Sequence, residues 1–216
     1  MGSEFHWNTV TPEMRAVMQG FAGSALSKEF YLAEGAALAL QLGHRFSIDL
    51  DFFSATQEDV PALVEPLRQA LKDFSPVLAD SAWGNLVFLA KDVRVGFYGY
   101  GYELIEPLLQ AGGISLASVA DIGLMKLNAL LSRASRKDFH DLYAICQHTT
   151  LRELLTLAPR KYPSVRDFEA QVTRHMLAFK RAEQETPVPL IEQVAWETVK
   201  DWFQAQAKMI GSSWLP

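Results

Sequence analysis

The pattern of hydrophobic and polar positions divides this chain into two parts of different character. Up to about residue 107, apolar runs of strand length alternate with short segments of helical spacing. After residue 107, apolar residues recur mainly at helical spacing. The sequence therefore predicts an α/β (α+β) domain with a mixed sheet over residues 8–107, followed by a helical C-terminal domain over residues 108–216.

Capping and breaking residues place the elements within each part. Helices are predicted where a capping residue or a glycine stop borders a helical pattern, and strands where apolar and β-branched residues cluster. Pro66 predicts a bend or a late start in its helix. The predicted helices cover residues 11–20, 36–43, 59–74, 116–133, 135–148, 150–159, 164–185 and 191–210. The predicted strands cover 29–35 and 47–54, with two or three more in 76–101.

Two aspartates interrupt the apolar pattern of the strand predicted over 47–54. Asp49 and Asp51 alternate with Leu50 and Phe52, so both carboxylates point to the same side of the strand. Adjacent carboxylates repel each other unless a cation lies between them, and Mg²⁺ binds through one or two carboxylates plus phosphate oxygens. The alternative is a solvated sheet edge, which is the more common meaning of an isolated D-x-D. The Gly35 turn and the helix start before this strand favour the metal site, since a helix N-terminus attracts phosphate.

Two segments of the chain resemble a known family. "FYLAEGAALALQLGHRFSIDLDFFS" (30–54) and "ASVADIGLMKLNALLSRASRKDFHDLYAI" (117–145) look like the two motif blocks of AbiEii-type nucleotidyltransferases, in the same order. These proteins are toxins of bacterial abortive-infection and toxin–antitoxin systems within the DNA-polymerase-β-like superfamily. The resemblance implies a nucleotidyltransferase-like fold and Mg²⁺-dependent transfer of a nucleoside monophosphate from an NTP to an acceptor. The implied acceptor is RNA, especially the tRNA 3′ end, with a protein hydroxyl as the alternative, and a cognate antitoxin is an implied partner.

The resemblance also implies roles for particular residues. Asp49 and Asp51 would hold Mg²⁺, Lys126 would contact the triphosphate, and Asp141, in preference to Asp138, would be the acid of the second block. The nucleotide site would be shaped by Gly35, Arg45, Ser47 and Lys126. Without the resemblance, Lys126 would be interpreted as a solvated cation, and the two acids of the second block as part of a surface ion-pair cluster.

Three positions depart from the family pattern. The phosphate turn has Glu34 and Ala36 where the family usually has a glycine and a threonine around Gly35. A third carboxylate is expected on a later strand, but Gly96 stands at the equivalent position, and spacing does not choose between Asp92 and Glu103 as a substitute. These departures leave open a second function, in which a catalytically degenerate protein binds nucleotide or a partner without turnover. A haloacid-dehalogenase-type phosphatase, which also uses D-x-D, is less favoured because it requires a different residue two positions after the second aspartate.

Composition limits the kinds of binding surface and the cellular compartment expected for this protein. The formal net charge of −5 argues against a broadly basic nucleic-acid-binding surface, although a local basic patch remains compatible with it. The single cysteine, Cys146, excludes an intrachain disulfide and fits a reducing compartment. No apolar run approaches the roughly 20 residues of a membrane-spanning helix, and no secretory signal is visible. The expected location is the cytoplasm.

Overall fold

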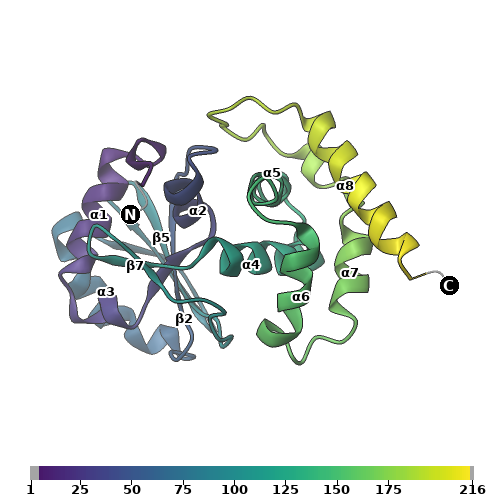
Figure 1. Cartoon of the computed structure of the whole chain (residues 1–216). Coiled ribbons are helices and arrows are strands. Elements are labelled where there is room, and N and C mark those ends of the chain that lie inside the picture. Colours follow the sequence, from purple (N-terminus) through teal and green to yellow (C-terminus); the bar gives the residue numbers. More distant parts are fainter. Residues whose placement is uncertain (1–4, 215–216) are drawn as a thin grey trace. The chain divides into compact units, whose positions relative to one another are not determined.

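The computed structural model describes residues 5–214, which form two compact units (Figure 1). The first unit ends at Ser118 and the second begins at Val119. The boundary between the units therefore falls after residue 118, whereas the pattern of the sequence placed the change from mixed to helical structure after residue 107.

The first unit is built on a mixed seven-stranded sheet with the order β3-β4-β5-β2-β1-β7-β6. Strand β2 pairs antiparallel with β1 and parallel with β5, and β1 pairs parallel with β7. The mixed sheet that was predicted from the sequence is confirmed. The strands are β1 (Tyr31–Ala33), β2 (Asp49–Ser54), β3 (Val77–Ala82), β4 (Asn85–Ala90), β5 (Val93–Gly99), β6 (Leu109–Ala111) and β7 (Ile114–Leu116).

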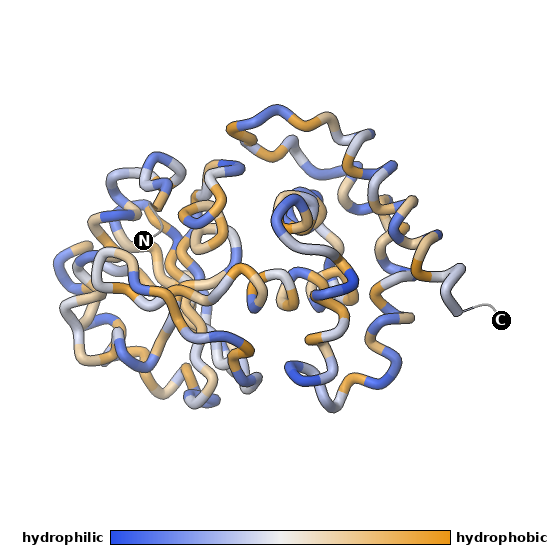
Figure 2. Tube along the Cα trace, viewed as in Figure 1, coloured by the Kyte–Doolittle hydropathy of each residue, from blue (hydrophilic) through white to orange (hydrophobic). Residues whose placement is uncertain are grey.

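The core of this unit lies on one face of the central strands. Leu50 and Phe52 of β2 and Phe97 of β5 are fully buried, and Phe97 lies 5.4 Å from Phe52 between ring centroids. Phe21 of helix α1 packs against both rings. Figure 2 shows hydrophobic residues along the central strands, with hydrophilic stretches in the outer loops. Because side chains alternate along a strand, this packing leaves the odd-numbered residues at the start of β2 on the opposite face.

Three α-helices, α1 (Pro12–Ala22), α2 (Glu34–Leu42) and α3 (Val64–Ala70), belong to this unit. The predicted start of α1 is confirmed, since the Thr11 side chain accepts a hydrogen bond from the Met14 amide at 3.2 Å. The predicted end of α2 is confirmed by Gly43, which adopts a left-handed φ of 67°. The prediction of one continuous helix over 59–74 was wrong, but the late start predicted from Pro66 is confirmed, since α3 begins at Val64. That segment divides into a 3₁₀ turn (Val60–Leu63), α3 with Pro66 in its first turn, and a second 3₁₀ turn (Lys72–Phe74).

Strands β6 and β7 were missed in the sequence. Each spans three residues, which is too short for a period of two to be recognised. They are joined by Gly112 and Gly113, both at positive φ, and β7 extends the sheet by pairing Leu116 with Leu32 of β1. The residues after 107 thus still contribute to the sheet before the helical unit begins.

The second unit is helical, as predicted. Its α-helices are α4 (Val119–Ser132), α5 (Arg136–Ile145), α6 (Leu151–Lys161), α7 (Phe168–His175) and α8 (Trp196–Ser212). The helix predicted over 164–185 is much shorter in the structure, because Asp167 at a φ of 52° delays its start and the chain turns after Met176. That turn brings Phe179 onto Phe139, with ring centroids 5.2 Å apart. Across the described residues, no helix is both long and apolar enough to span a membrane.

Candidate functional site

The two aspartates of β2 lie on the face of the sheet opposite the aromatic core. Asp49 and Asp51 are both partly exposed, while Leu50 between them is fully buried. The register pairs Asp51 with Ala33 of β1 on one side and with Gly96 of β5 on the other. Ala33 is also the N-cap residue of α2. The structure therefore places the second aspartate of the D-x-D directly beside the start of a helix.

The β1–α2 turn has the features of an anion-binding helix start. The N-cap residue of α2, Ala33, makes no side-chain capping hydrogen bond, and the helix begins with Glu34 and Gly35. An uncapped helix start offers backbone N–H groups and a positive dipole end to an anion. Glu34 has a φ of 54°, in the left-handed region that glycine adopts at lower cost. The glutamate that departs from the family pattern thus retains the backbone conformation that a glycine would provide.

Of two further residues predicted to shape the nucleotide site, Arg45 lies against Gly35 of this turn and Ser47 contacts the D-x-D strand. Arg45 and Ser47 are each only 5% exposed. Arg45 donates a hydrogen bond from Nη1 to the Phe46 carbonyl at 3.0 Å, and Ser47 donates from Oγ to the Asp49 carbonyl at 3.4 Å. Their burial suits support of the turn and of the D-x-D strand, and direct contact with a nucleotide stays a prediction.

Gly35 is required by the position of the Arg45 side chain. A Cβ atom at residue 35 would collide with the guanidinium of Arg45, which is buried and has little room to move. We expect Gly35→Ala to lower the free energy of unfolding by about 1–3 kcal/mol, the usual cost of overpacking. Urea denaturation measures this loss. Gly211→Ala is the matched control, since that helical glycine has open space around it. Unchanged stability of the Gly35 variant would show that the arginine can move aside.

Sequence reasoning missed two further residues on the face that carries the aspartates. Arg94 and Tyr98 of β5 flank Gly96 at a spacing of two, and this alternation between apolar neighbours was the available signal. Arg94 Nη1 lies 3.3 Å from Asp51 Oδ1, and Arg94 Nη2 donates to the Tyr98 hydroxyl at 3.1 Å. Burial, followed by the negative charge of Asp51, raises the pKa of Tyr98 to about 12. The phenol therefore stays protonated at neutral pH.

The donor set of this face fits a magnesium ion. Within residues 5–214, no group of three or more His, Cys, Asp or Glu side chains gathers in a way that could hold a metal. Neither Asp92 nor Glu103 therefore completes a three-acid cluster with the D-x-D. Two partly exposed carboxylates on one face still suit Mg²⁺, which normally takes one or two carboxylates and completes its shell with water and substrate phosphates.

Lys126 and Asp141, from the second motif block, lie in the second unit and contact each other there. Lys126 Nζ is 3.0 Å from Asp138 Oδ1 and 3.0 Å from Asp141 Oδ2, and all three side chains are fully buried. Arg133 Nε adds a contact to Asp138 Oδ2 at 2.9 Å, and Ser135 Oγ donates to the same oxygen at 2.6 Å. The solvated cation and surface cluster considered from the sequence were wrong. These residues form a buried ionic cluster, which joins α4 to α5, and their assigned catalytic roles stay predictions.

The pKa of Asp138 makes the stability contributed by this cluster depend on pH. Burial raises the pKa of its carboxyl group, but the charge of Lys126 and the contacts from Arg133 outweigh that effect and hold the pKa below its ordinary value. A pKa lowered in the folded state stabilises the protein above the unfolded-state value, about 3.9, and this contribution is lost as the pH falls towards the folded-state pKa. We therefore expect the stability advantage of the natural protein over Asp138→Asn to shrink below about pH 4. Urea denaturation of both proteins between pH 7 and pH 3 measures it, and parallel curves would contradict the assignment.

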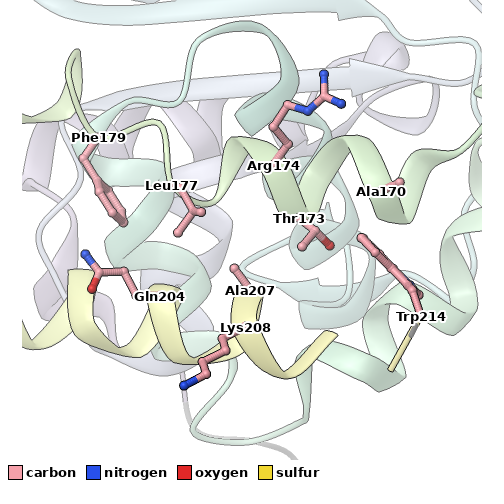
Figure 3. Close-up of a pocket in the computed structure, with 9 residues that line it drawn as sticks. All are labelled: Ala170, Thr173, Arg174, Leu177, Phe179, Gln204, Ala207, Lys208 and Trp214. Atoms are coloured by element: carbon pink, nitrogen blue, oxygen red, sulfur yellow. The ribbon is translucent and has the colours of Figure 1, made fainter. Parts of the chain in front are cut away.

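A groove of about 640 Å³ lies between α7 and α8 within the second unit (Figure 3). Among the described residues that line it there is no carboxylate or histidine, so it lacks the groups needed for metal-assisted chemistry. Its lining residues are Ala170, Thr173, Arg174, Leu177, Phe179, Gln204, Ala207, Lys208 and Trp214. The candidate site of the chain is the aspartate-bearing face of the sheet rather than this groove.

Known proteins resemble the chain in both sequence and fold. A family model described as the nucleotidyl transferase AbiEii toxin of a type IV toxin–antitoxin system matches residues 16–81. The uncharacterized protein aq_aa25 of Aquifex aeolicus (strain VF5) is 30% identical over 202 residues, which cover 91% of this chain and 95% of that protein. The match to the family model includes the D-x-D strand and the turn beside it.

Two solved structures share the fold. A candidate nucleotidyltransferase from H. pylori aligns with a TM-score of 0.56 at 18% identity and covers 93% of this chain and 92% of its own. MenT4, a nucleotidyltransferase toxin from Mycobacterium tuberculosis H37Rv, aligns with a TM-score of 0.55 at 16% identity and covers 90% and 83% of the two chains. The matching family model and the relative of 30% identity over most of the chain show that the chain belongs to the AbiEii nucleotidyltransferase family.

Proposed function

We propose that this protein is a Mg²⁺-dependent nucleotidyltransferase of a toxin–antitoxin or phage-defence system, acting in the cytoplasm. It transfers a nucleoside monophosphate from an NTP to an acceptor, with the tRNA 3′ end as the preferred acceptor. The observation that carries the proposal is the pairing of Asp51 with Ala33, the N-cap residue of α2. A carboxylate pair for a metal thus lies beside a helix start suited to phosphate. The family model's description as a type IV toxin supports a cognate antitoxin as partner.

The proposed reaction is an in-line displacement at the α-phosphorus. An acceptor hydroxyl oxygen forms a bond to that phosphorus, and the bond to the oxygen bridging the α- and β-phosphates breaks. The electron pair leaves with pyrophosphate, and the hydroxyl proton passes to water. Asp49 and Asp51 would hold Mg²⁺, which supplies neutralisation of the phosphate charge. The N–H groups at the start of α2 would position the phosphates, and Gly35 lets the backbone approach them without a Cβ.

An RNA acceptor is supported by a local basic groove in the second unit. The groove has a volume of about 370 Å³, and its cationic and titratable lining residues are Arg133, His175, Lys180 and Arg181. Cationic side chains that line a groove are suited to neutralising phosphates of a nucleic-acid backbone. Arg133 and Arg181 are each also paired with a carboxylate of the chain, Asp138 and Glu185, so the support that this groove gives to an RNA acceptor rests mainly on Lys180.

The test supplies every component of the reaction. The protein is incubated with Mg²⁺, total tRNA and each α-³²P-labelled NTP in turn, beside an Asp49→Ala, Asp51→Ala double variant. We expect label on the RNA with one or more NTPs and none with the double variant. Label on the protein itself would replace the RNA acceptor by a protein hydroxyl. Equal labelling by the double variant would contradict the proposal.

The second candidate function is nucleotide or partner binding without turnover. It is favoured by two observations: Glu34 places an acidic residue at the phosphate turn, and Gly96 offers no carboxylate opposite Asp51. If it holds, the natural protein shows no transfer with any NTP, and transfer appears only in a Glu34→Gly, Ala36→Thr variant. Robust turnover by the natural protein would exclude it.

A further inference from the structure

Glycine occupies the position on β5 where a third acid is expected, and a neighbouring cation reaches Asp51 instead. The parallel register of β2 and β5 places Arg94 opposite Asp49, and Gly96 opposite Asp51, on the same face. A Cβ atom at residue 96 would collide with the phenol ring of Tyr98. A third carboxylate is therefore absent from this position and could not enter without moving the tyrosine. The group that reaches Asp51 from β5 is instead the guanidinium of Arg94.

The guanidinium is held in place from two sides. Its Nη1 lies 3.3 Å from Asp51 Oδ1, and its Nη2 donates to the Tyr98 hydroxyl at 3.1 Å. Tyr98 is itself fixed by stacking on Phe53 of β2, with ring centroids 5.0 Å apart. The Arg94 side chain is still 42% exposed, so its remaining N–H groups can reach a bound anion.

We propose that Arg94 replaces the second divalent cation of a two-metal site, so that the protein uses a single Mg²⁺ held by Asp49 and Asp51. This inference rests on the proposed function. Three carboxylates with two divalent ions leave one net positive charge before the substrate binds. Two carboxylates with one arginine and one divalent ion leave the same charge. The guanidinium can also bind phosphate oxygens through two parallel hydrogen bonds and stabilise the charge of the transition state, as arginine does in other phosphoryl-transfer enzymes.

The first test determines how many metal ions the site holds. Mn²⁺ and inorganic tripolyphosphate serve as probes, because the binding of neither depends on which nucleobase the protein prefers. Equilibrium dialysis counts the Mn²⁺ bound per chain, and low-temperature electron paramagnetic resonance reports whether two ions lie close enough to couple, about 3.5–4 Å apart in two-metal sites. We expect one uncoupled Mn²⁺ per chain, and its loss in an Asp49→Asn, Asp51→Asn variant. A coupled pair in the natural protein would overturn this inference and leave the proposed transferase intact.

The second test separates the role of Arg94 from a structural one. In Arg94→Met, we expect the affinity for Mn²⁺ to rise about fivefold, the effect of removing one like charge at about 4 Å in a solvated site. The kcat for labelled-NMP transfer is expected to fall by about 10³-fold. Arg94→Lys should retain the weaker Mn²⁺ binding of the natural protein and recover only part of the kcat. A merely structural residue would instead lower Mn²⁺ affinity in both variants, and that result would overturn the inference.

The matched control is Arg68→Met. Arg68 has a similar exposure of 40% and also pairs with one carboxylate, Glu65, at 3.2 Å, but it lies on α3. We expect this variant to keep both the kcat and the Mn²⁺ affinity. Should the natural protein bind no Mn²⁺ that depends on the two aspartates, the proposed metal-dependent function itself fails, and the inference about Arg94 fails with it.

Discussion

Asp51→Asn is expected to lower the kcat of nucleotidyl transfer by about 10³-fold, because a metal ligand is worth several kcal/mol of transition-state stabilisation and each 1.36 kcal/mol corresponds to about tenfold in rate. The amide keeps the shape of the side chain and removes its charge. Asp51 is partly exposed, and its contact with Arg94 is a partly solvated ion pair, so the fold should lose no more than about 1 kcal/mol. Single-turnover transfer of labelled NMP measures the rate.

The control for this variant is Asp80→Asn. Asp80 is an exposed acid on the edge strand β3 of the same sheet, and strands β4 and β5 separate it from β2. We expect its kcat to match that of the natural protein. An Asp51 variant that also turns over at the natural rate would remove Asp51 from the metal site. The two aspartates would then be better explained as solvated residues at a sheet edge.

Lys126→Met is expected to lower the free energy of unfolding by about 3–5 kcal/mol, the usual cost of removing one partner from a buried ion pair. The substitution leaves Asp138 and Asp141 buried without their shared cation. Asp138 keeps the contacts from Arg133 and Ser135. Urea denaturation at pH 7 measures the change.

Lys137→Met is the matched control, because Lys137 is an exposed lysine on the same helix as both acids. It should alter stability by no more than about 0.5 kcal/mol. If Lys126 instead acts only on the triphosphate, as the family resemblance implies, Lys126→Met will keep the stability of the natural protein and raise the KM for NTP. The comparison of stability with KM therefore distinguishes the buried cluster from a substrate contact.

The buried cluster explains why the second motif block has its particular residues. Lys126 of α4 lies between two acids of α5, and Lys161 of α6 contacts Asp121 of α4 at 2.6 Å with both side chains fully buried. Buried charges without partners are costly, so each of these cations constrains how its helix can pack. Lys126 and the two acids of the second motif block, Asp138 and Asp141, therefore have a structural role within the helical unit in addition to any role in catalysis.

The sequence by itself determined the features that depend on neighbouring residues. Alternation predicted β2 and put Asp49 and Asp51 on one face, and capping chemistry predicted the start of α1 at Thr11 and the end of α2 at Gly43. The mixed sheet, the helical second unit and the family followed from these local patterns and the two motif blocks. Such features were predictable because periodicity and caps act over a few residues.

Only the tertiary structure decided the features that depend on residues far apart in sequence. The two 3₁₀ turns that flank α3, the short strands β6 and β7, and the turn after α7 depend on packing that no local pattern reports. Lys126 looked like a solvated cation because its acidic partners lie on another helix. Arg94 was missed because its contact with Asp51 exists only through the parallel pairing of β2 and β5. Strand register depends on the folding of the whole sheet, and it is register that places Arg94 and Gly96 beside the two aspartates.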